Sequence, residues 1–203
     1  MMISLTGGAA ISAISLISRF IIGLAVLILA LPKNAGAQPP YNPEIFQAGL
    51  YADIDRTVNC VDGPAGTVFR QYLWAWVPPD AGAVYVTTRI FFPDNVAQHG
   101  RPIPNALVTR LIITDYGSGG WEWNFLLADC PSGWILLAWQ DCLILDAGSS
   151  EVRISGESSL ARNCATFLLE GLSVLSNLRI GAGTCAPVPV ARSRWGAIKQ
   201  IYR

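Results

Sequence analysis

The chain has 203 residues, enough for one ordinary domain and too few for two large ones. Hydrophobic residues make up 52% and charged residues 14%, a composition that excludes an intrinsically disordered protein. The 14 basic and 14 acidic side chains balance, which excludes a strongly basic nucleic-acid binder. A single histidine, His99, excludes a multi-histidine metal centre and a two-histidine mechanism.

The N-terminal segment predicts export. Residues 20–31 are an uninterrupted apolar run between Arg19 and Pro32. As a helix, this run would rise about 18 Å, short of the roughly 30 Å bilayer core. Ala35-Gly36-Ala37 has small residues at both positions of an A-x-A cleavage site. We therefore expect residues 1–37 to be a signal peptide, and the protein to be secreted, either extracellular or periplasmic. An uncleaved anchor in which Arg19 snorkels remains an alternative.

Charge is distributed unevenly after residue 37. Residues 38–185 carry 8 basic and 14 acidic side chains, a net charge of −6. Residues 186–203 carry four basic side chains and no acid. This pattern indicates that the tail docks on the body of the same chain or on an anionic partner. The tail residues expected to make the contact are Arg192, Arg194, Trp195, Lys199, Tyr202 and Arg203.

Period-two alternation interrupted by turn residues dominates the chain after a proline-rich extended lead-in at residues 38–47. The predicted strands cover residues 50–55, 67–77, 83–92, 106–114, 121–128, 134–145, 151–155 and 164–180. We expect residues 48–185 to form an all-β domain, an Ig-like or cohesin-like β-sandwich of seven to nine strands, with a barrel as second choice.

Residues outside these strands are assigned to turns, loops or short helices. Residues 93–105 are expected to be a long polar connection, and residues 117–120 a hairpin turn. A small helix is compatible with residues 158–163 or with the surroundings of Asn95. Residues 186–203 are expected to be an extended basic tail, in which 195–203 could form two helical turns with Trp195, Ile198 and Tyr202 on one side.

All five cysteines follow residue 37. In an exported chain without a C-x-x-C pair, they indicate disulfides rather than metal ligands. Pairing of sequence neighbours predicts Cys130–Cys142 and Cys164–Cys185, and leaves Cys60 as a free or intermolecular thiol. A tight hairpin of the strands on either side of Cys130 is incompatible with the first bridge, because Cys142 would then lie at the end away from the turn.

The sequence carries little evidence for an enzyme or a metal site. His99, Asp115 and Ser118 have the chain order of a serine-protease triad, but the last two share one turn and cannot approach an imidazole from opposite sides. Asp53 and Asp55 begin like a calcium loop, but the glycine and glutamate of an EF-hand loop are missing. We assign no catalytic residue, no metal and no cofactor. Acidic pairs among Asp115, Glu122, Asp129 and Asp141 leave a glycoside hydrolase open as a minor alternative.

Tryptophan is the most unusual feature, with seven in the chain. Tyr72, Trp74 and Trp76 share one face of a predicted strand, and Trp121, Trp123 and Phe125 share one face of another. Most of these rings are expected in the core, with Trp121 the most exposed. Exposed rings could instead form a platform on which sugar rings stack. The candidate ligand-binding residues are Trp121, Trp123, Glu122, Asn124 and Arg70.

Two segments carry a resemblance. Residues 188–203 read VPVARSRWGAIKQIYR, and a C-x-x-x-W pattern at 130–134 precedes Q-D-C at 140–142. These segments resemble a group of uncharacterised exported bacterial β-rich proteins, although Arg194 stands where threonine is commoner. The resemblance implies secretion and a β-rich fold, and it brings no activity or catalytic residue.

Together these observations predict an exported, non-catalytic β-sandwich that acts as a structural or protein-interaction module. Its expected partner is an envelope protein or polysaccharide, with no nucleic acid, and with the membrane met only through the signal segment. A carbohydrate-binding module is the first alternative, and a secreted hydrolase the second.

Overall fold

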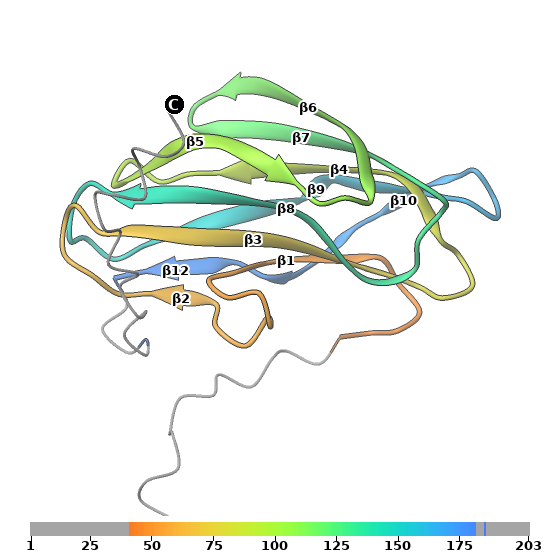
Figure 1. Cartoon of the computed structure of the whole chain (residues 1–203), viewed down its shortest axis with the longest axis horizontal. Coiled ribbons are helices and arrows are strands. Elements are labelled where there is room, and N and C mark those ends of the chain that lie inside the picture. Colours follow the sequence, from red (N-terminus) through yellow and green to blue (C-terminus); the bar gives the residue numbers. More distant parts are fainter. Residues whose placement is uncertain (1–40, 182–184, 186–203) are drawn as a thin grey trace, which may run out of the picture. The chain divides into compact units, whose positions relative to one another are not determined.

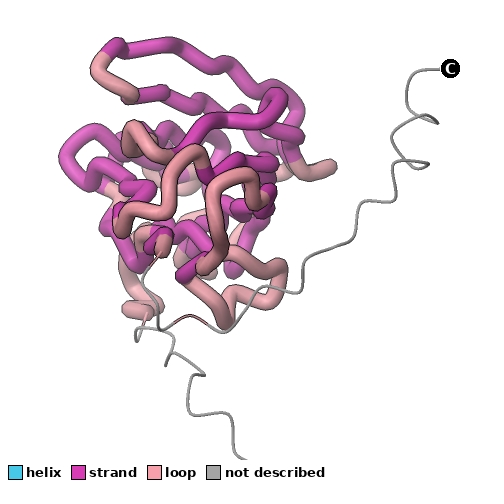
Figure 2. The backbone as a smooth tube through the Cα atoms, turned by 90° about the vertical axis from the view of Figure 1, so that its left-hand side faces the viewer, coloured by secondary structure: helices cyan, strands magenta, loops and turns pink. Residues whose placement is uncertain are grey.

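A computed structural model describes residues 41–181 and 185, all of which are strands, turns and loops (Figure 2). The strands are β1 (Gln47–Tyr51), β2 (Cys60–Val61), β3 (Val68–Val77), β4 (Ala83–Phe91), β5 (Val96–Pro104), β6 (Val108–Gly117), β7 (Gly120–Leu127), β8 (Gly133–Ile144), β9 (Ser150–Asn163), β10 (Leu169–Gly171), β11 (Ser173–Ser176) and β12 (Leu178–Ile180). In this part of the chain, no helix is long and apolar enough to cross a membrane. The predicted signal peptide, residues 38–40 of the lead-in, and the basic tail lie outside the described residues.

The strands form two sheets packed face to face (Figure 1). One sheet has the order β11-β1-β3-β8-β5, and the other has the order β2-β12-β9-β4-β7-β6, with β10 paired to β9. The core lies between them, because alternate residues of the strands point inward and most of these are apolar. Leu73 and Leu137 fill it from the first sheet, and Ile90, Phe125 and Leu178 fill it from the second. The predicted β-sandwich is confirmed.

The strand count is twelve among the described residues, above the expected seven to nine, because residues 164–180 form three strands instead of one and because β2 and β5 were not predicted. β10 pairs with β9 of the second sheet, β11 pairs with β1 of the first, and β12 returns to β9. The chain therefore changes sheets twice within a dozen residues. Alternation cannot reveal such a change, since it reports which residues share a face and not which sheet receives the strand.

Two other segments expected outside the strands, 93–105 and 158–163, also contain strand residues. Residues 93–105, expected as a polar connection, contain β5, an edge strand that pairs with β8 and is interrupted between His99 and Ile103. Edge strands often carry polar residues, proline and bulges, which hide the alternation. No helix forms at 158–163 or beside Asn95, because β9 continues through Asn163 with an irregular segment between Ser155 and Leu160.

The first strand lies three to four residues earlier than predicted, since β1 begins at Gln47, the last residue of the expected lead-in. β1 ends at Tyr51, and residues 52–57 form a turn closed by a hydrogen bond from Ala52 N to Val58 O at 2.7 Å. Ala52 and Ile54 therefore do not continue the alternation that Leu50 begins. Every residue of β1 is buried, and Ala48 and Leu50 belong to the core.

The disulfides differ from the predicted pairing. Cys60 bonds to Cys185 and Cys130 bonds to Cys164, with Cα–Cα separations of 5.6 and 6.1 Å. β7 and β8 belong to different sheets, so the hairpin considered above does not exist. Most of β8 separates Cys130 from Cys142, roughly 30 Å at about 3.3 Å per residue, whereas a disulfide needs Cα atoms within about 7 Å.

The free cysteine is Cys142 rather than Cys60. Its side chain is fully buried on the inner face of β8, opposite Phe69. Burial, with a smaller effect from the charge of Asp141, raises the pKa of this thiol far above its ordinary value. Cys142 therefore packs as a small apolar residue and is neither a ligand nor a cross-link.

Candidate functional site

The outer face of the five-stranded sheet carries a cluster of large aromatic rings, here called the aromatic face. Tyr72, Trp74 and Trp76 of β3 share this face, as their spacing predicts. Their register partners on β8 include Trp134, opposite Trp76, and Trp139, opposite Tyr72. These rings lie outside the sandwich, which corrects the expectation that this row fills the core.

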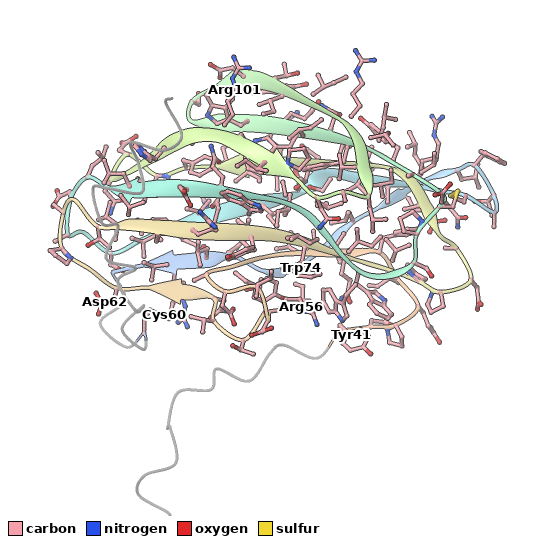
Figure 3. The ribbon with its side chains drawn as sticks, viewed as in Figure 1. Tyr41, Arg56, Cys60, Asp62, Trp74 and Arg101 are labelled. Carbon is pink, nitrogen blue, oxygen red and sulfur yellow. A yellow bond between two sulfur atoms is a disulfide. The ribbon has the colours of Figure 1, made fainter. Side chains whose placement is uncertain are left out.

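Other segments of the chain cover one end of the aromatic face (Figure 3). The ring of Tyr41 lies 4.7 Å from that of Trp76, centroid to centroid, and Trp76 Nε1 donates to Pro43 O at 3.3 Å. The guanidinium of Arg56 lies 4.6 Å from the ring centroid of Trp74 and 4.5 Å from that of Trp134. Arg56 thus contacts both indoles through cation–π interactions.

Arg70 covers the other end of the aromatic face. Its guanidinium lies 3.8 Å from the ring centroid of Trp139, and its Nε and Nη2 donate to the two carboxylate oxygens of Asp141 at 2.8 and 3.2 Å. The hydrogen bond to Asp141 raises the pKa of Arg70. Since protein groups already lie over these rings, the aromatic face offers little open ring surface on which a sugar could stack.

The five candidate ligand-binding residues do not form one site, although Glu122 and Asn124 lie side by side. Trp123 is 1% exposed and belongs to the core. Trp121 is on the same inner face of β7, partly exposed at one side of the sandwich. Glu122 and Asn124 alternate with these tryptophans and therefore point to the opposite, outer face. Arg70 belongs to the other sheet. The prediction of a single site with these residues is wrong, because it joined both faces of one strand with a residue from the opposite sheet.

The outer face of the seven-stranded sheet carries a connected polar network that crosses three strands. Tyr85 of β4 donates its hydroxyl hydrogen to Asn124 Oδ1, and Asn124 Nδ2 donates to Glu122 Oε1 at 3.3 Å. The other carboxylate oxygen of Glu122 accepts from Arg89 Nη2 at 3.3 Å. The Arg89 guanidinium also lies 3.8 Å from the ring centroid of Tyr116, on β6. This network fixes the directions of polar side chains on an open sheet surface.

Apolar and basic side chains surround this network, and together they form what we call the arginine face. Ile112 is 44% exposed, Tyr116 53% and Leu126 38%. By strand register, this face carries Arg89, Arg110, Arg153, Arg162 and Arg179 with Glu122 and Glu151. Five arginines and two glutamates give it a charge of +3, although residues 38–185 together carry −6.

Sequence reasoning missed Tyr85, Arg89, Ile112, Tyr116 and Leu126. A signal for them was present, because Tyr85, Thr87 and Arg89 alternate with buried Val86, Thr88 and Ile90. That alternation predicts a polar outward face on β4. It does not reveal that β7 lies beside β4 and β6 beside β7, an order that adds Asn124 and Tyr116 to the same surface.

Of the residues weighed for catalysis and calcium, Asp115 and Asp53 each close a local turn. His99 is exposed on β5 of the five-stranded sheet, whereas Asp115 and Ser118 belong to the β6–β7 hairpin, where Asp115 accepts from Gly117 N at 2.7 Å. The predicted hairpin turn at 117–120 is thus confirmed. Asp53 accepts hydrogen bonds from Thr57 N and Val58 N at 3.0 and 2.8 Å, which closes its own turn. Within residues 41–181 and 185, no three His, Cys, Asp or Glu side chains group as a metal site.

Comparison with solved structures identifies the architecture. A cohesin module of a family 33 glycoside hydrolase from Clostridium perfringens superposes with a TM-score of 0.55, at 8% identity, over 68% of this chain and 96% of that one. The domain has a cohesin-like fold. A cohesin from Clostridium acetobutylicum gives a TM-score of 0.53 at 17% identity, covering 70% and 96% of the two chains.

A third cohesin, from a type I cohesin–dockerin complex of Clostridium thermocellum, gives a TM-score of 0.52 at 11% identity, covering 68% and 94%. At these identities the likeness concerns the fold alone. No family model matches the sequence, and no curated protein matches it.

Proposed function

We propose that this protein is an exported, non-catalytic interaction module that binds an acidic protein partner through the arginine face. The observation that carries the proposal is the network of Tyr85, Asn124, Glu122 and Arg89, which holds oriented polar groups beside exposed Ile112 and Leu126. Apolar contacts next to fixed polar groups are the combination found in specific protein interfaces.

Charge favours an acidic partner. Arg110, Arg153 and Arg162 make no ion pair with another described residue. Exposed charges of one sign on a surface accelerate association with a surface of the opposite sign. The cohesin-like fold supports the same function, since solved cohesins with this architecture include complexes with dockerins.

Export is supported by the disulfides and by the N-terminal sequence. Two bridges, Cys60–Cys185 and Cys130–Cys164, are typical of an oxidising compartment. The apolar run at 20–31 and the A-x-A motif at 35–37 indicate a signal peptide.

The test compares capture by three forms of the oxidised chain. The native protein, an Arg110→Glu/Arg162→Glu variant and an Arg101→Glu control are immobilised and exposed to the envelope and secreted fractions of the source organism. Arg101 is exposed and lies on β5, a strand of the other sheet. We expect a protein that is retained by the native and control forms and lost from the double variant. That protein, purified, should then bind with an affinity that weakens as salt rises. Equal capture by all three forms would refute the assignment of this face.

Carbohydrate binding through tryptophan is the second candidate, favoured by the partly exposed Trp121 alone. A glycan array on the oxidised protein, with a Trp121→Ala variant beside it, tests this function separately. Binding that depends on Trp121 would establish it.

A further inference from the structure

A groove of about 1030 Å³ opens on one side of the sandwich, between the edge strands β5 and β6. Its apolar lining includes Leu111 and Ile113 from β6, Trp121 from β7, and Phe92, Pro102 and Pro104 from the segment around β5. Asp94, Gln98 and Arg101 add polar groups. Leu111, Ile113 and Trp121 pack against the core yet remain partly exposed. The sandwich is therefore incompletely closed along this side, and apolar surface there is available to bind another segment.

The two edge strands that border the groove differ in how they resist association. β5 contains Pro102, Pro104 and an irregularity beside Gly100, features that prevent another strand from pairing with its free edge. β6 is ten residues long, contains no proline, and carries Leu111, Ile112 and Ile113 in succession. A long apolar edge of this kind is prone to aggregate unless a segment covers it.

The last described residues lie near one end of the groove. Gly181 packs on Gly148, where an added Cβ would lie 2.9 Å from Gly148 O. The same carbonyl oxygen accepts from Asn95 Nδ2 at 2.7 Å, and Asp94 and Val96, on either side of Asn95, line the groove. Gly181 N also donates to Val61 O at 2.8 Å, next to the Cys60–Cys185 bridge. The disulfide thus holds Cys185 near the end of the groove that Asp94 and Val96 line, and the C-terminal segment starts from there.

Residues 186–203 are long enough to reach and fill the groove. Residues 186–191 can span about 20 Å when extended, and twelve residues then remain for contact. Trp195, Ile198 and Tyr202 supply apolar side chains that match the apolar lining. The segment has a charge of +4 and no acid, while the groove lining carries Asp94 and Arg101, and Asp115 is the register partner of Trp121. Attraction of the basic segment to Asp94 and Asp115 favours contact, and repulsion from Arg101 offsets part of it, so the apolar match contributes most.

We propose that residues 192–203 of the same chain bind in the groove between β5 and β6 and close the open side of the sandwich. The apolar residues of this segment cover Leu111, Ile113 and Trp121, and its basic residues face Asp94 and Asp115. This contact uses the inner side of β6, so it leaves the arginine face on the outer side free.

A spin label on the full, oxidised chain tests the proposal. Ser193→Cys adds a thiol for attachment of a nitroxide. The nitroxide reagent should react at this position alone, because Cys142 is buried and the other four cysteines are bonded. In NMR spectra of the isotope-labelled chain, the nitroxide broadens the signals of amides near it. We expect the amide signals of groove residues such as Arg101 and Ile113 to lose intensity, and the signal of Arg162, on the far part of the arginine face, to keep it. Ile113→Arg should restore the groove signals by removing an apolar contact and repelling the basic segment.

Ile112→Arg is the matched control, because the same residue type, one position earlier on β6, faces outward. It should leave the broadening unchanged. Should Ile113→Arg fail to fold, Trp195→Ala/Ile198→Ala alters only the segment and should restore the groove signals equally.

Groove signals that keep their intensity in the spin-labelled chain without further substitutions overturn the proposal. Broadening that appears only when spin-labelled chains are mixed with isotope-labelled chains also overturns it, since the segment would then bind a second copy. Neither result depends on the partner proposed for the arginine face.

Discussion

Arg70 Nε donates to Asp141 Oδ1 at 2.8 Å across the β3–β8 pair, and this contact holds the guanidinium over Trp139. The pair thereby covers part of a ring that its strand position would otherwise expose further, and Trp139 is half-buried. Because the Arg70 side chain is 43% exposed, the ion pair itself contributes little to stability, while its position restricts access to the aromatic face.

Arg70→Ala is therefore expected to expose an indole at small cost. Acrylamide should quench more of the tryptophan fluorescence than in the native protein, and the free energy of unfolding should fall by about 0.5–1 kcal/mol. Arg101→Ala, which removes an arginine that lies over no described ring, is the control. Equal quenching in the native protein and both variants would show that Arg70 does not shield Trp139.

The buried thiol of Cys142 predicts a pH effect on stability. Its pKa is raised in the folded state, so the unfolded state loses a proton at lower pH than the folded state. The free energy of unfolding should be unaffected by this group below about pH 8, and should fall above it by up to about 1.4 kcal/mol per pH unit. Urea unfolding of native protein and Cys142→Ala between pH 7 and about pH 10 measures the difference. Parallel curves for the two proteins would contradict the prediction.

The same thiol should be unreactive in the folded protein. A thiol reagent added to the oxidised chain should modify no cysteine without denaturant and one cysteine per chain after unfolding, because four of the five are bonded. Peptide mapping of the modified protein should place the label on Cys142. A label on Cys60 would support instead the pairing of sequence neighbours.

Loss of the Cys130–Cys164 bridge should destabilise the domain without abolishing the sandwich. The bridge closes a segment with a sequence separation of 34, for which the loss of chain entropy in the unfolded state corresponds to about 4 kcal/mol. Cys130→Ala/Cys164→Ala should lower the midpoint of thermal unfolding while one cooperative transition remains. Cys130→Ala/Cys142→Ala is a useful comparison, because it also breaks this bridge and adds a cavity in the core. It should therefore be less stable than the first variant.

Trp121 and Trp123 should differ sharply in their effect on stability. Trp123 is 1% exposed and contacts Phe125 in the core, so Trp123→Ala should cost about 3–5 kcal/mol. Trp121 borders the groove and is only partly buried by the described residues, so Trp121→Ala should cost less. Chemical denaturation of both variants measures the two values. Similar losses would mean that the groove side of β7 is as tightly packed as its centre.

The cohesin-like sandwich could be predicted because its signal is local. Alternation in residues 67–77, 83–92 and 121–128, and glycines at 117, 119 and 120, mark strands and a hairpin wherever these segments lie. The candidate site could not be predicted in the same way. Alternation places Glu122 and Asn124 together on one face, but Arg89 and Tyr116 join them only through the order of strands in the sheet.

By itself, the sequence determined the all-β class, the turn at 117–120, the shared face of Tyr72, Trp74 and Trp76, and a limit of two disulfides within one chain. Tertiary structure alone decided that the row of Tyr72, Trp74 and Trp76 faces outward, that Cys130 pairs with Cys164, and that Cys142 stays free in the core. The physical reason is that period two relates neighbours along one strand. Which face is buried, and which cysteines meet, depends on packing between strands far apart in the chain.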